Sequence, residues 1–160
     1  MNSVAAIIED LSASQNSFYM IKEFNKLSAR KDMSMSMFYV RPSMPVIKPF
    51  FSCRNISFLS GFNGTAIATN IANAKILLKS HNNCKKYLYM WDLEWLKIPS
   101  NFSDVCDTLL DKRLNLIARS ESHASVVKNF CNKDVVAIID NWNMNQILSL
   151  NNSEEKKCLA

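Results

Sequence analysis

The chain contains 160 residues, of which 48% are hydrophobic and 21% are charged. These values exclude a globally disordered chain and suit one compact domain, because a chain of 160 residues buries a core but is short for two domains. The formal net charge of +5 favours an anionic partner such as a nucleic acid or a nucleotide, although proteins with other functions are often as basic. No apolar run approaches the roughly 20 residues that cross a bilayer, so we expect no membrane partner.

The cysteines are Cys53, Cys84, Cys106, Cys131 and Cys158. Their odd number and the lack of CxxC or Cys/His spacing argue against a disulfide framework and a zinc site. The N-terminal residues include Glu9 and Asp10 and lack the basic and long apolar regions of a secretory signal. We therefore expect the protein in a reducing cytoplasm.

Apolar residues recur at helical spacing over residues 1–30, which predicts a helical N-terminal segment. Polar residues 12–17 are expected to divide this segment into two helices. Residues 33–40 alternate with a period of two, as a strand does with its two faces. Three prolines within residues 42–49 then predict an extended and exposed linker.

From residue 55 the predicted strands and helices alternate. The expected strands are 55–60, 86–91, 114–118 and 135–139. A turn at 61–64 is expected to open a helix at 65–79, and further helices are expected from about 103, from 120 or 122 to 131, and from 143 to 150. Residues 151–160 are polar and are expected to fray. The alternation predicts an α/β fold, a Rossmann-like open and mostly parallel sheet flanked by helices, preceded by the helical N-terminal segment.

The stretch Trp91-Asp92-Leu93-Glu94-Trp95 turns an apolar run abruptly acidic. A buried carboxylate loses several kcal/mol of hydration unless it is paired or solvated, so these acids are expected at a rim. Two residues apart on an extended segment, Asp92 and Glu94 would point to one side and could bind a divalent ion or act as proton donor and base. The competing interpretation is an exposed strand end whose acids pair with neighbouring lysines.

Polar residues follow four of the predicted strands. Ser60-Gly61, Asp92 with Glu94, Arg119-Ser120 and Asp140-Asn141-Trp142 all stand at carboxyl ends. In an open parallel sheet these ends share one edge, and ligands bind in the crevice there. We therefore expect these four places to converge on one site.

The chain has two glycines, and both lie in the turn Gly61-Phe62-Asn63-Gly64-Thr65. If a helix follows, its free amides could hold a phosphate or diphosphate, with Gly61, Asn63, Gly64 and Thr65 as contacts. The turn matches neither the P-loop nor the GxGxxG pattern, and a plain turn with Asn63 or Thr65 as helix cap is the alternative.

Arg119, Ser120 and His123 form a second candidate group. Arg119 at a strand end can bind phosphate oxygens, Ser120 or Ser122 can cap the next helix, and His123 lies one turn further on. In the alternative, Ser120 is a cap and His123 a surface residue.

Asp140, Asn141 and Trp142 are candidates for binding a sugar. The carboxylate could bond a hydroxyl while the indole stacks on the ring. An aspartate in this position also often caps the following helix.

Several blocks of the chain resemble a known family. They are Ser-Gly-Phe-Asn-Gly-Thr, Ala-Thr-Asn-Ile-Ala-Asn-Ala-Lys, Tyr-Met-Trp-Asp-Leu-Glu-Trp and Ile-Ala-Arg-Ser-Glu-Ser-His-Ala. Over residues 55–150 the chain resembles small glycosyltransferase-like proteins of tailed bacteriophages. The resemblance implies a nucleotide-sugar as co-substrate, no tightly bound cofactor and, as in T-even-type phages, transfer of glucose or arabinose to hydroxymethylcytosine in DNA.

On this hypothesis Asp92 takes the proton from the acceptor hydroxyl, and Glu94 and His123 are further catalytic candidates. Arg119 and helix N-terminal amides would stabilise the leaving diphosphate, while Asp140 and Glu94 orient the sugar. Typical members have two Rossmann-like domains, whereas this chain has room for one. It is then a reduced form, completes its cleft as a homodimer or has lost catalysis.

Two alternatives stay open. A non-catalytic phage protein would bind nucleic acid or a host protein through its basic surface, and another nucleotide-binding enzyme would use the same sheet edge. Candidate contacts to a DNA backbone are Arg41, Lys48, Lys85 and Lys86. For a phage protein, the expected location is the host cytoplasm.

Overall fold

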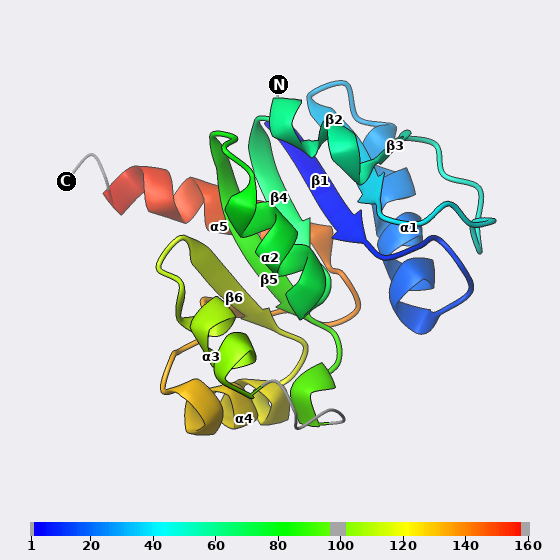
Figure 1. The fold of residues 1–160 in the computed structure, drawn as a ribbon. Helices are drawn as coiled ribbons and strands as arrows, with labels where there is room; N and C mark the ends of the chain where they lie inside the picture. The colour runs from blue at the N-terminus through cyan, green and yellow to red at the C-terminus, as the bar shows by residue number, and fades with distance from the viewer. Residues whose placement is uncertain (1, 97–101, 158–160) are drawn as a thin grey trace.

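The computed structural model describes residues 2–96 and 102–157. Within these ranges, seven parallel strands form one sheet in the order β3-β2-β1-β4-β5-β6-β7 (Figure 1). The strands are β1 (Asn2–Ile8), β2 (Met33–Tyr39), β3 (Ser52–Asn55), β4 (Gly64–Ala68), β5 (Cys84–Met90), β6 (Leu114–Ala118) and β7 (Ala137–Ile138). The helices are α1 (Gln15–Ser28), α2 (Ile71–Lys79), α3 (Phe102–Leu110), α4 (Glu121–Cys131) and α5 (Met144–Lys157), with 3-10 helices η1 (Ile56–Gly61) and η2 (Glu94–Leu96). The prediction of a Rossmann-like parallel sheet flanked by helices is confirmed.

Helices cover both faces of the sheet. α1 and α5 contribute to one buried cluster, and α2, α3 and α4 contribute to another. In β1, Val4, Ala6 and Ile8 belong to the first cluster, whereas Ala5 and Ile7 belong to the second. All five side chains are at most 4% exposed. A strand buried on both faces reads in sequence as a continuous apolar run.

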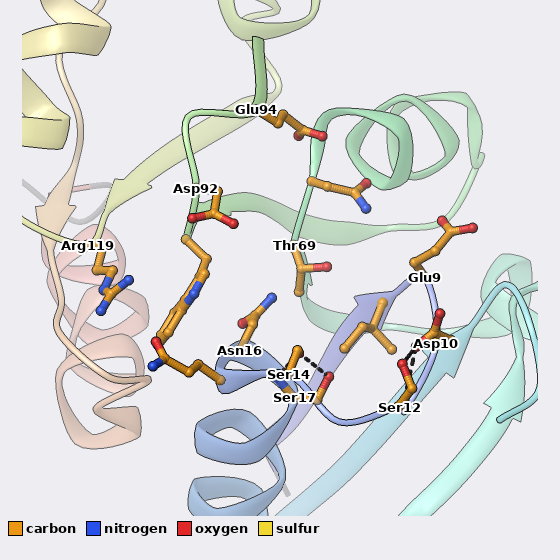
Figure 2. Close-up of a pocket in the computed structure, with 14 residues that line it drawn as sticks. Glu9, Asp10, Ser12, Ser14, Asn16, Ser17, Thr69, Asp92, Glu94 and Arg119 are labelled. Carbon is orange, nitrogen blue, oxygen red and sulfur yellow. Dashed lines mark hydrogen bonds between the residues drawn. The ribbon is translucent and has the colours of Figure 1, made fainter. Parts of the chain in front are cut away.

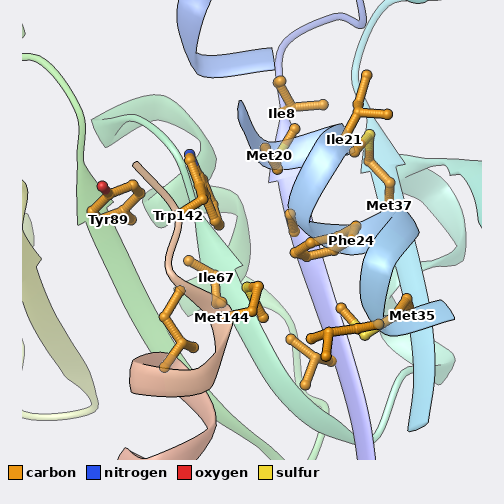
Figure 3. Close-up of a cluster of buried hydrophobic side chains, with 14 of the residues drawn as sticks. Ile8, Met20, Ile21, Phe24, Met35, Met37, Ile67, Tyr89, Trp142 and Met144 are labelled. Atoms are coloured by element: carbon orange, nitrogen blue, oxygen red, sulfur yellow. The ribbon is translucent and has the colours of Figure 1, made fainter. Parts of the chain in front are cut away.

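The face under α1 and α5 carries an aromatic centre (Figure 3). The ring of the fully buried Trp142 lies 4.6 Å from that of Tyr89 and 6.2 Å from that of Phe24, measured between centroids. The Tyr89 hydroxyl donates a 2.7 Å hydrogen bond to the carbonyl oxygen of Ile139. Burial of the phenol raises the pKa of Tyr89 to about 12. These contacts tie β5 to the segment that follows β7.

The chain leaves the centre of the sheet in two directions. β2 and β3 follow β1 on one side, whereas β4 lies on the other side of β1 and is followed outward by β5, β6 and β7. In open parallel sheets, a crevice forms at the carboxyl ends of the two neighbouring strands between which the strand order reverses. The topology therefore directs attention to the carboxyl ends of β1 and β4.

The prediction that residues 1–30 are helical is wrong for its first part and confirmed for its second. Residues 2–8 form the central strand β1, and α1 covers Gln15–Ser28. An apolar run of alanine, valine and isoleucine fits either a buried helix or a fully buried strand by periodicity alone. In the folded protein this run is a strand at the centre of the sheet, and both of its faces are buried.

Two further predictions are corrected between β3 and α2. Residues 56–61 form η1, not a strand, and residues 64–68 form β4, not the start of a helix. α2 begins at Ile71, because the Asn70 side chain caps it by accepting a 2.7 Å hydrogen bond from the N–H of Asn73. Ala66, Ile67 and Ala68, which were expected in the helix, belong instead to a strand buried at the sheet centre.

The other predicted strands and helices are confirmed with small changes at their ends. The tail 151–160 was expected to fray; α5 continues through 151–157, and 158–160 lie outside the described residues. Across 2–96 and 102–157, no helix has the length and apolar character needed to cross a membrane. The four cysteines in these ranges are free thiols, and Cys158 lies outside them.

Candidate functional site

A cleft of about 460 Å³ opens at the carboxyl ends of β1, β4, β5 and β6 (Figure 2). It includes the point between β1 and β4 where the order of the strands in the sheet reverses. The loop after β1 and the first turn of α1 form one wall, and the segments after β4, β5 and β6 form the other. The polar and charged lining residues are Glu9, Asp10, Ser12, Ser14, Gln15, Asn16, Ser17, Thr69, Asn70, Asp92, Glu94 and Arg119. The cleft thus combines four carboxylates and one guanidinium with hydroxyl and amide groups.

The loop between β1 and α1 brings two carboxylates to the cleft. Arg41 Nε lies 3.2 Å from Glu9 Oε1, and Arg41 Nη2 lies 3.7 Å from Asp10 Oδ2. Asp10 also accepts hydrogen bonds from the hydroxyl and, at 3.0 Å, from the backbone N–H of Ser12. The hydrogen bonds from Ser12, and to a smaller extent the charge of Arg41, lower the pKa of Asp10. Both carboxylates are therefore held in place and paired with Arg41.

The N-terminus of α1 faces the cleft. Ser14 caps this helix by accepting a 3.0 Å hydrogen bond from the N–H of Ser17. The Asn16 side chain accepts a 2.7 Å hydrogen bond from the indole Nε1 of the buried Trp142. Because α1 is 14 residues long, its aligned peptide dipoles favour an anionic group at this end.

The N-terminus of α2 meets the opposite wall and is already occupied by side chains. Glu94 Oε1 accepts a 2.5 Å hydrogen bond from the N–H of Ile71, next to the cap made by Asn70. Glu94 lies at the start of η2, so the extended segment expected to place it beside Asp92 is absent. In this structure Glu94 satisfies a helix-terminal amide, which favours a structural role for it.

Asp92 and Arg119 follow β5 and β6 and both line the cleft (Figure 2). The guanidinium carbon of Arg119 lies 4.1 Å from the centre of the Trp91 ring. Trp91 is only 6% exposed, so a buried aromatic face supports the cation. Asp92 is exposed, whereas the other three lining carboxylates are half-buried. Two of the four predicted strand ends therefore converge, those after β5 and β6.

The turn expected to bind phosphate is placed elsewhere, which corrects that prediction. Its residues are Gly61, Asn63, Gly64 and Thr65. It leads into β4, so no helical amides follow it. Gly64 pairs with Cys84, the first residue of β5, which puts the turn at the amino edge of the sheet, opposite the cleft. Gly64 has a φ of +135°, and a Cβ there would lie 2.3 Å from the carbonyl oxygen of Ser3, so packing against β1 explains this glycine.

Ser120 and His123 lie on α4 and its cap, and neither lines the cleft. The Ser120 hydroxyl accepts a 3.3 Å hydrogen bond from the N–H of His123, which confirms its capping interpretation. His123 is half-buried, and its Nδ1 lies 3.4 Å from the carbonyl oxygen of Met90. The ring thus contacts the end of β5 beside the cleft.

Asp140, Asn141 and Trp142 also do not line the cleft. Trp142 has no exposed surface, so the prediction that its ring stacks on a sugar is wrong. Asn141 and Trp142 have φ angles of 46° and 58°, in the left-handed region that bulky residues rarely adopt. Burial and the hydrogen bond to Asn16 hold Trp142 there. The Asp140 side chain accepts a 2.8 Å hydrogen bond from the Asn141 amide.

The basic residues proposed to contact DNA are scattered. Lys85 and Lys86 lie near the start of β5, at the edge opposite the cleft. Lys86 is buried and donates a 2.7 Å hydrogen bond to the side chain of Asn82. Arg41 pairs with the acids after β1, and Lys48 is exposed in the linker. Together they do not form one basic surface around the cleft.

The wall after β1 was not predicted from the sequence. Its residues are Glu9, Asp10, Ser12, Ser14, Gln15, Asn16 and Ser17, and Thr69 and Asn70 after β4 were missed as well. The available signal was the change from a fully apolar run to two acids and then serines that can cap a helix. The helical interpretation of residues 1–30 hid this signal.

Among residues 2–96 and 102–157, no three His, Cys, Asp or Glu side chains are grouped to hold a metal ion. The lining groups nevertheless suit a polar organic ligand, because hydroxyls and amides both donate and accept hydrogen bonds. Comparisons with protein-family models, curated proteins and solved structures found no significant match. The functional argument therefore depends on the cleft itself.

Proposed function

We propose that the protein is a glycosyltransferase-like enzyme of the host cytoplasm. It transfers a sugar from a nucleotide-sugar donor to an acceptor hydroxyl, with hydroxymethylcytosine in DNA as the acceptor. The observation that carries the proposal is the lining of the cleft, where an exposed carboxylate, a supported guanidinium and many hydroxyl and amide groups meet. A sugar presents several hydroxyls that each donate and accept, so this lining suits a polyhydroxylated ligand.

Asp92 is the base in this mechanism, because it is the exposed carboxylate among the four that line the cleft and an acceptor hydroxyl can reach it from solvent. Glu9 and Asp10 are half-buried beside Arg41, and the half-buried Glu94 accepts a hydrogen bond from the first turn of α2. Asp92 takes the proton of the acceptor hydroxyl as the oxygen forms a bond to the anomeric carbon of the donor. The bond from that carbon to the diphosphate oxygen breaks, and the nucleoside diphosphate leaves with the electron pair.

Arg119 and the N-terminus of α1 would neutralise the charge that develops on the diphosphate. Stacking on Trp91 limits the motion of the Arg119 guanidinium, so little reorganisation is required when the leaving group forms. The dipole of α1 adds a favourable field from the other wall. Ser12, Ser14 and Asn16 then lie where they can hydrogen-bond the sugar (Figure 2).

Thermal unfolding with a panel of UDP-, GDP- and ADP-sugars tests donor binding. A ligand that binds only the folded chain stabilises it by about 2.7 kcal/mol at 100 times its Kd, which shifts the Tm by several degrees. We expect the sugars of one nucleotide to shift the Tm of the wild type and, to the same extent, that of Asp92→Asn, because Asp92 acts on the acceptor. Arg119→Gln should lose most of the shift, because Arg119 binds the diphosphate of the donor. Arg30→Gln is the matched control, because Arg30 is exposed and pairs with Asp32 near the start of β2.

If no nucleotide-sugar of the panel shifted the Tm of the wild type, the proposal would be contradicted. If this protein also bound DNA tightly and with strong salt dependence, a non-catalytic nucleic-acid-binding module would be favoured instead.

A further inference from the structure

A second hollow lies beside the cleft along the first turns of α1. It has a volume of about 390 Å³ and is lined by Ala13, Ser14, Gln15, Phe18, Tyr19 and Val46. Ser14 and Gln15 line both hollows, so the two adjoin at the start of α1. The residues that belong to the second hollow alone are mainly apolar and aromatic. A ligand in the cleft can therefore extend onto an aromatic surface.

An aromatic row connects this hollow to the cleft. The Phe18 and Tyr19 rings lie 5.5 Å apart, and the Tyr19 and Trp91 rings lie 5.9 Å apart, measured between centroids. Arg119 covers Trp91 at one end of the row, and Lys22 Nζ lies 5.9 Å from the centre of the Phe18 ring at the other. The row thus carries a cation at each end.

Packing of the core does not explain Phe18. The residues that α1 buries are Ser17, Met20, Ile21, Phe24 and Leu27. Phe18 is 40% exposed and Tyr19 is half-buried. Exposed aromatic rings beside cationic side chains are a common platform for unpaired nucleic-acid bases, because every base has a flat face that can stack.

We infer that Phe18 and Tyr19 form a stacking subsite for a base of the acceptor strand, with Lys22 next to a phosphate that flanks this base. The inference rests on the proposed function, which explains why a DNA strand approaches the cleft. A base within a strand has a phosphate on both sides, whereas the base of a nucleotide-sugar has its phosphates on one side. The donor's diphosphate lies at the Arg119 end of the row, so the cation at the opposite, Lys22 end matches a phosphate of the strand. A stacked base must be single-stranded or turned out of the duplex.

Fluorescence polarisation with a labelled single-stranded oligonucleotide of roughly ten nucleotides tests the subsite. Phe18→Ala and Phe18→Leu are each expected to weaken binding about tenfold, because neither residue offers a ring for stacking. Lys22→Gln should reduce the salt dependence by about one phosphate contact. The control is Phe58→Ala, which removes a ring that is 62% exposed on η1. Melting temperatures of all variants verify that they fold.

Unchanged oligonucleotide affinity in the Phe18 variants, or no binding by the wild type, would overturn the inference. The donor-induced shift in Tm should persist in Phe18→Ala. If that variant lost the donor shift and kept its oligonucleotide affinity, the ring would serve the donor and the inference would fall. The wild type could instead bind the oligonucleotide more tightly than the Phe18 variants and show no shift in Tm with any nucleotide-sugar. This result would contradict the proposed function but not the stacking subsite.

Discussion

Replacing Gly64 with alanine should destabilise the fold strongly. Its φ of +135° lies in a region almost reserved for glycine, and adopting it costs another residue about 1–3 kcal/mol. The added Cβ would also lie 2.3 Å from the carbonyl oxygen of Ser3 in the central strand β1, so backbone must move. Overpacking of this kind adds about 1–3 kcal/mol. We therefore expect a loss of about 2–6 kcal/mol from a folding free energy of roughly 5–15 kcal/mol.

Urea unfolding followed by tryptophan fluorescence measures this loss, since three tryptophans report on the core. Gly61→Ala is the control, because a Cβ at Gly61 meets no atom within 4 Å and its φ is ordinary. Its free energy of unfolding should stay within about 0.5 kcal/mol of the wild type. Equal unfolding midpoints for the two alanine variants would refute the placement of Gly64 against β1.

Three further substitutions test the fold. Lys133→Met removes an ammonium that donates to three backbone carbonyls at 2.7–2.9 Å, and should cost about 1–3 kcal/mol in urea unfolding. The hydrogen bond from Arg113 lowers the pKa of Asp111 to about 2, so the folded state loses stability as the pH falls from about 4 to 2. After solvent screening, this loss is about 1 kcal/mol. Unfolding midpoints measured across that pH range should change less in Asp111→Asn than in the wild type. Burial raises the pKa of Tyr89 to about 12, so stability is lost as pH rises from about 10. The Tm of Tyr89→Phe should therefore decrease less than that of the wild type as the pH rises above about 10. At pH 7 its Tm should be lower than that of the wild type, because the hydrogen bond to Ile139 is lost.

The alternating pattern from residue 84 onward predicted the second half of the fold well. Cys84–Met90 and Leu114–Ala118 are short apolar strands, and Ser120 is a capping residue directly before the helix α4. Propensity, cap and periodicity agree in this part of the chain, so local information was sufficient.

In the first half, β1 and β4 resisted prediction because both faces of these strands are buried. In β1 and β4, alanine-rich runs have no period-two alternation, and periodicity alone does not separate them from helices. Misplacing β4 moved the Gly61–Thr65 turn to the wrong edge of the sheet, and misplacing β1 hid Glu9 and Asp10. Asp92 and Arg119 were found because they follow strands that were assigned correctly.

Trp142 shows a different limit. The sequence places it after a strand among polar residues, where an exposed ring is a reasonable expectation. Its burial depends on α1 from the other end of the chain, through the hydrogen bond to Asn16 and contact with Phe24. A long-range contact of this kind leaves no local signal in the sequence.

The most direct test of sugar transfer is the nucleoside mass of hydroxymethylated DNA, single-stranded and duplex, after incubation with the protein and nucleotide-sugars. The wild type should increase the mass of hydroxymethyldeoxycytidine by one glycosyl unit. Asp92→Asn should slow this transfer by about 10²–10⁴-fold while it keeps the donor-induced shift in Tm. Transfer by Asp92→Asn at the wild-type rate, or no product from the wild type with a donor that binds it, would contradict the proposed mechanism.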